Sequence, residues 1–304
     1  MSKSRTDGGL LFGVAAYGLW GLFPLYWTLL AHASAVEVLA HRVAWSALVT
    51  VLLVWGTRRW PGFVAIWRSP GARWRLAIAA AILAVNWGVY IWGVNSGHVV
   101  ETSLGYFINP LVTVGLGVLV LGERLGAWQW TALGIALAAV VVLTLDYGRP
   151  PWIALILAAS FATYGLLKKQ AAVGAIESQA YESLALAPLA LGYLTYLEAS
   201  GAAVFSHTGP ATDILLALSG VVTAVPLILF GAAALRLSMT ALGLLQYLAP
   251  IIQFALGLLV FHEAMPPARW LGFAFVWVAL LIFTVDALRS RRASARADLV
   301  VQPD

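Results

Sequence analysis

The sequence of 304 residues contains no cysteine, and only 10% of its residues are charged. The absence of cysteine excludes disulfide frameworks, thiol nucleophiles and cysteine metal sites. A soluble domain usually has about 25% charged and about 45–50% apolar residues. Here 62% of the residues are hydrophobic. The composition therefore predicts a chain that is embedded in a membrane.

Several motifs of enzyme active sites are also missing. The chain has no His-Glu-x-x-His motif, no Gly-x-Ser-x-Gly motif and no Gly-x-x-x-x-Gly-Lys-Ser/Thr phosphate loop. Its 5 histidines are scattered over different segments, which argues against a metal site. We therefore expect no enzyme activity, no catalytic residues, no metal and no cofactor. A membrane-embedded enzyme and a non-transporting membrane assembly protein remain as alternatives.

Apolar windows of about 20 residues are long enough to cross the hydrocarbon core of a bilayer as helices. The chain has ten such windows, and the loops between several of them are very short. The pattern predicts an all-α integral membrane protein with ten transmembrane helices. The predicted spans are 9–30, 36–56, 76–95, 103–121, 127–146, 151–167, 180–198, 213–235, 240–261 and 269–288.

The basic residues are distributed unequally between the two sides of this predicted bundle. With ten spans both termini lie on one side, which carries 15 of the 18 Lys and Arg residues, whereas the opposite side carries 2. Because cytoplasmic loops are enriched in Lys and Arg, we expect a multi-pass protein of the inner (plasma) membrane with both termini in the cytoplasm. Loop placement explains the net charge of +5, so nucleic acid is not an expected partner. The expected partners are the lipid bilayer and a small-molecule substrate, and a homo-oligomer is left open.

An internal repeat relates the two halves of the chain. Residues 103–146 align without a gap on residues 243–286, with ten identities that include Pro110 with Pro250. The ten spans divide into five in residues 1–150 and five in residues 151–304. Since five is an odd number, the two halves must be inverted relative to each other. Inverted repeats occur in many secondary transporters, which bind substrate near the membrane midplane between the halves.

Among the prolines inside predicted spans, Pro24, Pro110 and Pro250 are the predicted helix kinks. Proline has no N–H and leaves the carbonyl four residues earlier without its helical partner. In hydrocarbon such a carbonyl is tolerated where it faces protein or a water-filled cavity. We therefore predict kinked helices that face a polar cavity, with a kink that serves only packing as the alternative.

Polar and aromatic side chains deep in the predicted spans are candidates for a binding site. An aromatic wall with a few amides suits an amphipathic organic ligand, although the same residues could instead form a packed core. The candidate substrate-binding residues are Trp20, Arg42, Asn86, Trp87, Tyr90, Tyr106, Asn109, Glu182, Gln246, Tyr247 and Gln253.

Ionisable residues inside spans are rare and usually face the bundle interior or a water-filled path. Arg42 and Glu182 could pair with each other across the repeat, or each could bind a group of opposite charge; for Arg42 a structural ion pair is the competing interpretation. Glu37 and His41 lie four residues apart on one helix face and could relay protons, because histidine titrates near neutral pH. A solvated Glu37 and a hydrogen-bonded, packed His41 are the alternatives.

The stretch ETSLGYFINPL at 101–111 resembles the RarD branch of the EamA-type transporters, in the drug/metabolite transporter superfamily. The stretches YGLWGLFPLYW at 17–27, HRVAWS at 41–46 and YGLLKK at 164–169 are similar to the same branch. This resemblance covers nearly the whole chain.

The resemblance implies ten helices in two inverted EamA repeats around a central cavity, and alternating access as the mechanism. It implies a secondary transporter of small organic metabolites or drugs, and we expect an exporter. Glu123 and Glu263 match the glutamate that recurs at a helix end of the repeat, for which the resemblance implies a structural role.

Overall fold

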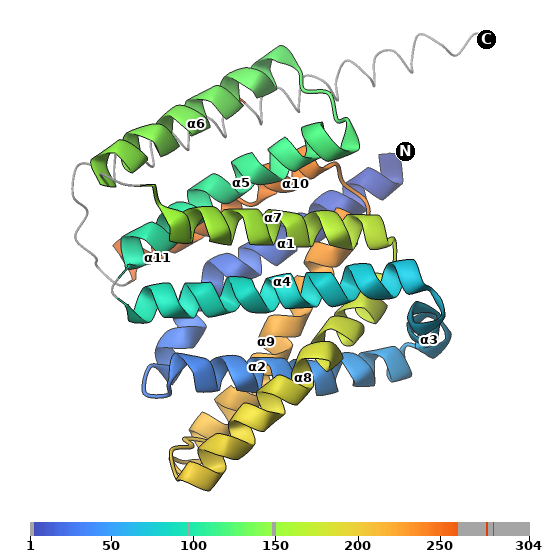
Figure 1. Cartoon of the computed structure of the whole chain (residues 1–304), viewed down its shortest axis with the longest axis vertical. Coiled ribbons are helices and arrows are strands. Elements are labelled where there is room, and N and C mark those ends of the chain that lie inside the picture. Colours follow the sequence, from blue (N-terminus) through green and yellow to red (C-terminus); the bar gives the residue numbers. More distant parts are fainter. Residues whose placement is uncertain (1–2, 97, 148–149, 261–277, 279–281, 283–304) are drawn as a thin grey trace.

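A computed structural model describes residues 3–96, 98–147 and 150–260, together with residues 278 and 282. Every element in this part of the chain is helical, which confirms the prediction of an all-α protein (Figure 1). The elements are α1 (Lys3–Trp27), η1 (Thr28–Leu30), α2 (Ala35–Gly56), α3 (Trp60–Arg68), α4 (Pro70–Asn95), α5 (Val99–Leu121), α6 (Ala127–Tyr147), α7 (Trp152–Ala171), α8 (Ala175–Ser200), α9 (Pro210–Ala234), α10 (Met239–Leu245) and α11 (Leu248–Leu259).

Within the described residues, each predicted span coincides with a helix or with a pair of helices. In the described part of the chain, five helices are long and apolar enough to cross a membrane by length and composition. These are Thr6–Leu30, Ala35–Gly56, Pro70–Gly93, Trp152–Ala171 and Pro210–Ala234. The predicted tenth span, 269–288, lies outside the described residues apart from two isolated positions.

The short helix α3 lies in a segment for which the sequence predicts a loop. Pro61 occupies its first turn, where a missing N–H costs no helical hydrogen bond. Phe63 and Ile66 are buried in a cluster with Tyr181 of α8, whereas Ala65 and Arg68 on the opposite face are exposed. Burial on one face only explains why a segment too short to span a membrane forms a helix.

The predicted ninth span is interrupted. Helix α10 ends at Leu245 and α11 begins at Leu248. Pro250 has no N–H to offer the carbonyl of Gln246, so the helix breaks where the sequence predicted a kink. Pro110, by contrast, lies inside the uninterrupted helix α5. Pro24 lies near the end of α1, just before the chain tightens into η1.

The two halves of the sequence share one packed interior. Helix α7 packs against both α4 and α5, α2 packs against α8 and α9, and α1 packs against α9 and α11. Figure 1 shows this interleaving directly, with α7 lying between α4 and α5. Side chains from helices far apart in sequence can therefore meet at one site.

Five aromatic rings, from Tyr17, Trp20, Phe161, Tyr164 and Phe230, form what we call the aromatic cluster. They join α1, α7 and α9, and neighbouring ring centroids lie 5.2 to 6.2 Å apart. Aromatic rings at such separations add stabilisation beyond the area that they bury. The aromatic cluster is continuous with the largest buried core of the described residues, which extends to the start of α10.

Candidate binding cavity

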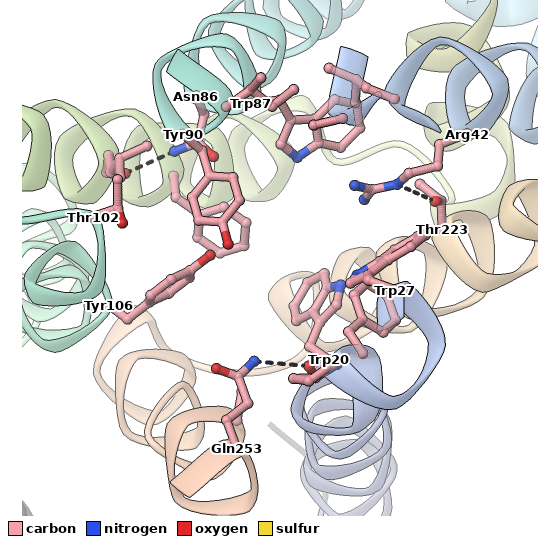
Figure 2. Close-up of a pocket in the computed structure, with 18 of the residues that line it drawn as sticks. Trp20, Trp27, Arg42, Asn86, Trp87, Tyr90, Thr102, Tyr106, Thr223 and Gln253 are labelled. Carbon is pink, nitrogen blue, oxygen red and sulfur yellow. Dashed lines mark hydrogen bonds between the residues drawn. The ribbon is translucent and has the colours of Figure 1, made fainter. Parts of the chain in front are cut away.

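A cavity of about 640 Å³ lies between α1, α2, α4, α5, α7, α9 and the break between α10 and α11 (Figure 2). Its volume is that of a site for a small organic molecule. At one end the cavity reaches the loop between α1 and α2, where Ala31 and Ala35 are exposed. At the other end lies the aromatic cluster, and beyond it Met239 and Leu242 of α10 are fully buried. Within the described residues, the cavity is therefore accessible near the loop between α1 and α2 and closed where the aromatic cluster lies.

The predicted binding residues line this cavity, except for Glu182 and Tyr247. Two of the three predicted kink prolines, Pro24 and Pro250, line it as well, whereas Pro110 does not. The predicted residues that line it are Trp20, Arg42, Asn86, Trp87, Tyr90, Tyr106, Asn109, Gln246 and Gln253.

Arg42 extends from α2 into the cavity. Its Nε donates a hydrogen bond of 2.9 Å to Thr223 Oγ1 of α9. The guanidinium carbon lies 4.7 Å from the ring centroid of Trp27 and 5.2 Å from that of Trp87. In Figure 2 the guanidinium faces the space between these two rings. Neutral groups therefore hold the cation, through one hydrogen bond and two cation–π contacts.

Gln253 replaces the backbone hydrogen bond that Pro24 removes from α1. Pro24 cannot donate to the carbonyl of Trp20 four residues earlier. The Nε2 of Gln253, on α11, donates to this carbonyl at 3.1 Å instead (Figure 2). A side chain from the second half of the chain thus completes the backbone of the first helix at the cavity wall.

Amides also join other helices around the cavity. Gln246 Nε2 donates to Thr113 Oγ1 at 3.1 Å, and this hydroxyl lies 3.4 Å from Asn109 Oδ1. The network connects α5 with the break between α10 and α11. Asn86 Nδ2 donates to the carbonyl of Leu157 at 3.0 Å and to Ser160 Oγ at 2.8 Å, which ties α4 to α7. These amides both position the walls and border the cavity.

Glu182 does not pair with Arg42, and it does not line the cavity. Its Oε1 accepts from Lys168 Nζ at 2.9 Å, and its Oε2 accepts from the hydroxyl of Tyr164 at 2.9 Å. Lys168 also donates to Ser178 Oγ at 2.9 Å. The side chains of Lys168 and Glu182 are 2% and 1% exposed. The sequence predicts a loop position for Lys168, because a basic residue at a span end usually lies at the membrane surface, and this prediction is wrong.

The predicted proton relay is not assembled at the cavity, since neither Glu37 nor His41 lines it. Glu37 is buried, and its Oε1 accepts from the backbone N–H of Val204 at 2.7 Å and of Phe205 at 3.3 Å. His41 Nδ1 accepts from Trp45 Nε1 at 3.2 Å, and its ring lies 4.8 Å from that of Phe205. The two residues hold the loop between α8 and α9, so the hydrogen-bonded, packed histidine is what the structure contains.

Glu123 also has a structural position. Its carboxylate accepts from the backbone N–H groups of Met239 and Thr240, at 2.6 and 2.9 Å, and from Thr240 Oγ1 at 2.7 Å. A carboxylate at a helix N-terminus is favourable because the first N–H groups have no partner within the helix. The helix-end glutamate of the first half therefore fixes the start of α10 in the second half. Its repeat counterpart Glu263 lies outside the described residues.

Tyr247 is buried beside the helix break but does not reach the cavity. The site prediction missed several lining residues, of which Trp27, Thr223 and Phe161 matter most here. Trp27 follows Trp20 and Pro24 at helical spacing, which was a usable signal. Thr223 and Phe161 gave no such signal, because a lone threonine or phenylalanine is ordinary in an apolar span.

Comparison with known proteins places the chain among membrane transporters. Residues 7–145 match the family model described as the EamA-like transporter family. The Protein RarD of Streptomyces exfoliatus is 55% identical over 298 residues, which cover 98% of this chain and 94% of that protein. An uncharacterized transporter of Bacillus subtilis (strain 168), YojE, is 40% identical over 303 residues, which cover 97% of this chain and 99% of that protein. A solved crystal structure with 20% identity has a TM-score of 0.71 and covers 94% of this chain and 99% of its own, which shows similarity of fold alone.

Proposed function

The chain belongs to the RarD branch of the EamA-like transporters, and on this premise we propose that it is a secondary transporter of small organic molecules. It works by alternating access, with residues 1–150 and 151–304 as two inverted five-helix repeats that rock around the cavity. The observation that carries the proposal is a cavity of substrate size that is accessible at one end and closed by the aromatic cluster at the other.

The internal repeat supports a site between the halves. The offset of 140 residues that aligns Pro110 with Pro250 also aligns Tyr106 with Gln246. Tyr106 and Gln246 both line the cavity, on α5 and at the break between α10 and α11. A site built from equivalent positions of two inverted repeats is the arrangement expected of a transporter that exposes it alternately to either side.

We further propose export across the plasma membrane as the direction of transport, in line with the expectation from the sequence. With both termini placed in the cytoplasm by the distribution of Lys and Arg, the open end of the cavity faces outward. This is the state from which an exporter releases its substrate. Return to the inward state then requires the rings of the aromatic cluster to separate, while the walls around Ala31 and Ala35 close.

Flux through sealed proteoliposomes tests this proposal with a panel of amino acids, aromatic metabolites and amphenicol antibiotics. For a panel compound that the wild type moves, we expect Asn109→Ala and Gln246→Ala to lower flux between about 2-fold and 10-fold, the effect of losing one hydrogen bond. Gln129→Ala is the matched control, because Gln129 accepts from the Gly126 N–H before α6 and does not line the cavity. Both variants should insert and fold as the wild type does.

Wild-type flux in both cavity variants would remove Asn109 and Gln246 from the site. Chemical conversion of a panel compound in detergent, without sealed vesicles or a gradient, would favour the alternative of a membrane-embedded enzyme.

A further inference from the structure

The cavity contains a cation without an acidic counterpart among its described lining residues. These residues include no Asp, Glu, Lys or His, so Arg42 is the one charged side chain among them. A buried charge in a membrane protein is costly unless it is paired or solvated. The substrate itself can supply the opposite charge.

The guanidinium of Arg42 is held in place by few of its N–H donors. Its Nε–H bonds to Thr223, and this is its one hydrogen bond to the residues that the structure describes. A guanidinium has five N–H donors in a rigid fork, which matches the two oxygens of a carboxylate. The flanking rings of Trp27 and Trp87 fix the plane of this fork without using the remaining donors.

The remaining walls fit a flat apolar body. Trp20 and Phe161 belong to the aromatic cluster at the inner end of the cavity, and Phe23 also lines it. Tyr90 and Tyr106 lie across from Arg42 (Figure 2). Aromatic side chains provide large apolar contact areas and stack on other rings. A cavity of about 640 Å³ has room for an aryl group and a short acidic side chain together.

We infer that the substrate is a small organic monoanion whose carboxylate binds Arg42 and whose aromatic body packs on the surrounding rings. This assignment rests on the proposed transport function and names its substrate class. One arginine compensates one negative charge, so a phosphate ester with about two charges is a poorer match. A cationic compound meets Arg42 as a like charge. The ammonium of a zwitterionic amino acid finds no carboxylate among the described lining residues.

Binding of four matched probes to the purified full-length protein tests the assignment. The probes are 3-phenylpropanoate, its neutral amide, 3-phenylpropylamine and phenylalanine, which share one aryl body and differ in charge. We expect the carboxylate to bind at least about tenfold more tightly than the amide, the size of a charge-assisted hydrogen-bond pair, and more tightly than phenylalanine or the amine.

Arginine variants then locate the effect. Arg42→Gln should abolish the preference for the carboxylate, so that the carboxylate and the amide bind about equally. Arg42→Lys should retain part of the preference, because the charge remains but the guanidinium fork is lost. Arg236→Gln is the matched control, since Arg236 bonds the carbonyl of Ala232 and lies outside the cavity. A monodisperse elution profile checks that each variant is folded.

Equal or tighter binding of the amide, the amine or phenylalanine overturns the inference. So does a carboxylate preference that survives in Arg42→Gln, or no binding of 3-phenylpropanoate up to its solubility limit. Flux measurements in proteoliposomes distinguish failure of this substrate assignment from failure of the proposed transport function. Binding of the anion without flux of any probe would overturn transport, whereas flux of the amide or amine that ignores Arg42→Gln would overturn only the substrate class.

Discussion

Lys168 and Arg42 show two ways to hold a positive charge inside this bundle. Lys168 is packed between helices and satisfied by Glu182 and Ser178, both at 2.9 Å. Arg42 lies at the cavity and is held by Thr223 and two indole faces, with no acidic residue among the described lining residues. Protein groups neutralise the charge of Lys168, whereas the guanidinium of Arg42 keeps N–H donors that a ligand can bind. The comparison distinguishes a charge that is neutralised by protein groups from the one that we propose binds the substrate.

Packing explains why the two sites differ. At Lys168 the helices approach closely, and a Cβ at Gly231 of α9 would lie 3.2 Å from the lysine Cε. Such a contact leaves no room for a ligand or for bulk water. Arg42, by contrast, lines the cavity, so its guanidinium borders space that protein does not fill. The same energetic cost of a buried charge is therefore met by protein in one place and by water or substrate in the other.

The largest expected effect comes from breaking the ion pair. Glu182→Gln should lower the free energy of unfolding by about 3–5 kcal/mol, because the charged Lys168 is left buried without a carboxylate. The loss is measured by unfolding the purified protein in mixed detergent micelles. The double variant Lys168→Met with Glu182→Leu removes both charges and should recover most of the stability. Wild-type stability of Glu182→Gln would show that the pair is not structural.

A smaller effect is expected from the neutral contact between α11 and α1. Gln253→Leu leaves the Trp20 carbonyl without the donor that replaces the N–H missing at Pro24. An unpaired buried carbonyl costs about 1–3 kcal/mol in the same unfolding assay. Gln170→Leu, at an exposed position of α7, should change stability by less than about 0.5 kcal/mol. If the two variants behave alike, the interaction with Trp20 does not contribute to stability.

The smallest effect on stability is expected at the cavity cation. Arg42→Gln should change the free energy of unfolding by less than about 1 kcal/mol, because removing this charge strands no carboxylate among the described lining residues. Thermal unfolding of the folded variant, beside Glu182→Gln, measures the contrast. A loss near that of Glu182→Gln would make Arg42 a structural partner, and the distinction between the two cations would fail.

Much of the candidate site could be predicted from the sequence, because polar and aromatic residues deep in apolar spans have few other reasons to be there. This reasoning found Arg42, Asn109 and Gln246. It failed for Glu182, which is equally polar and equally deep. Depth in a span says that a charge needs compensation, but it does not say whether a protein group or a ligand provides it.

The break between α10 and α11 was predictable from Pro250 alone, whereas the continuity of α5 through Pro110 was not. Pro250 and Pro110 occupy equivalent positions in the two halves, yet only the second-half helix is interrupted. Both prolines lack the same N–H. The effect of that loss depends on the neighbouring helices, and α5 packs closely against α7 and α10. A local rule thus gives the position of weakness, and tertiary contacts decide whether the helix breaks.

The sequence alone determined that the chain forms long apolar helices and which positions in them carry polar groups. Both properties depend on local composition and on the backbone's need for internal hydrogen bonds in hydrocarbon. Only the tertiary structure decided which polar groups meet. Lys168 finds Glu182 at 14 residues of separation, and Gln253 finds Trp20 at 233. Helical periodicity sets the face on which a side chain lies, but the helix opposite that face is chosen by packing over the whole bundle.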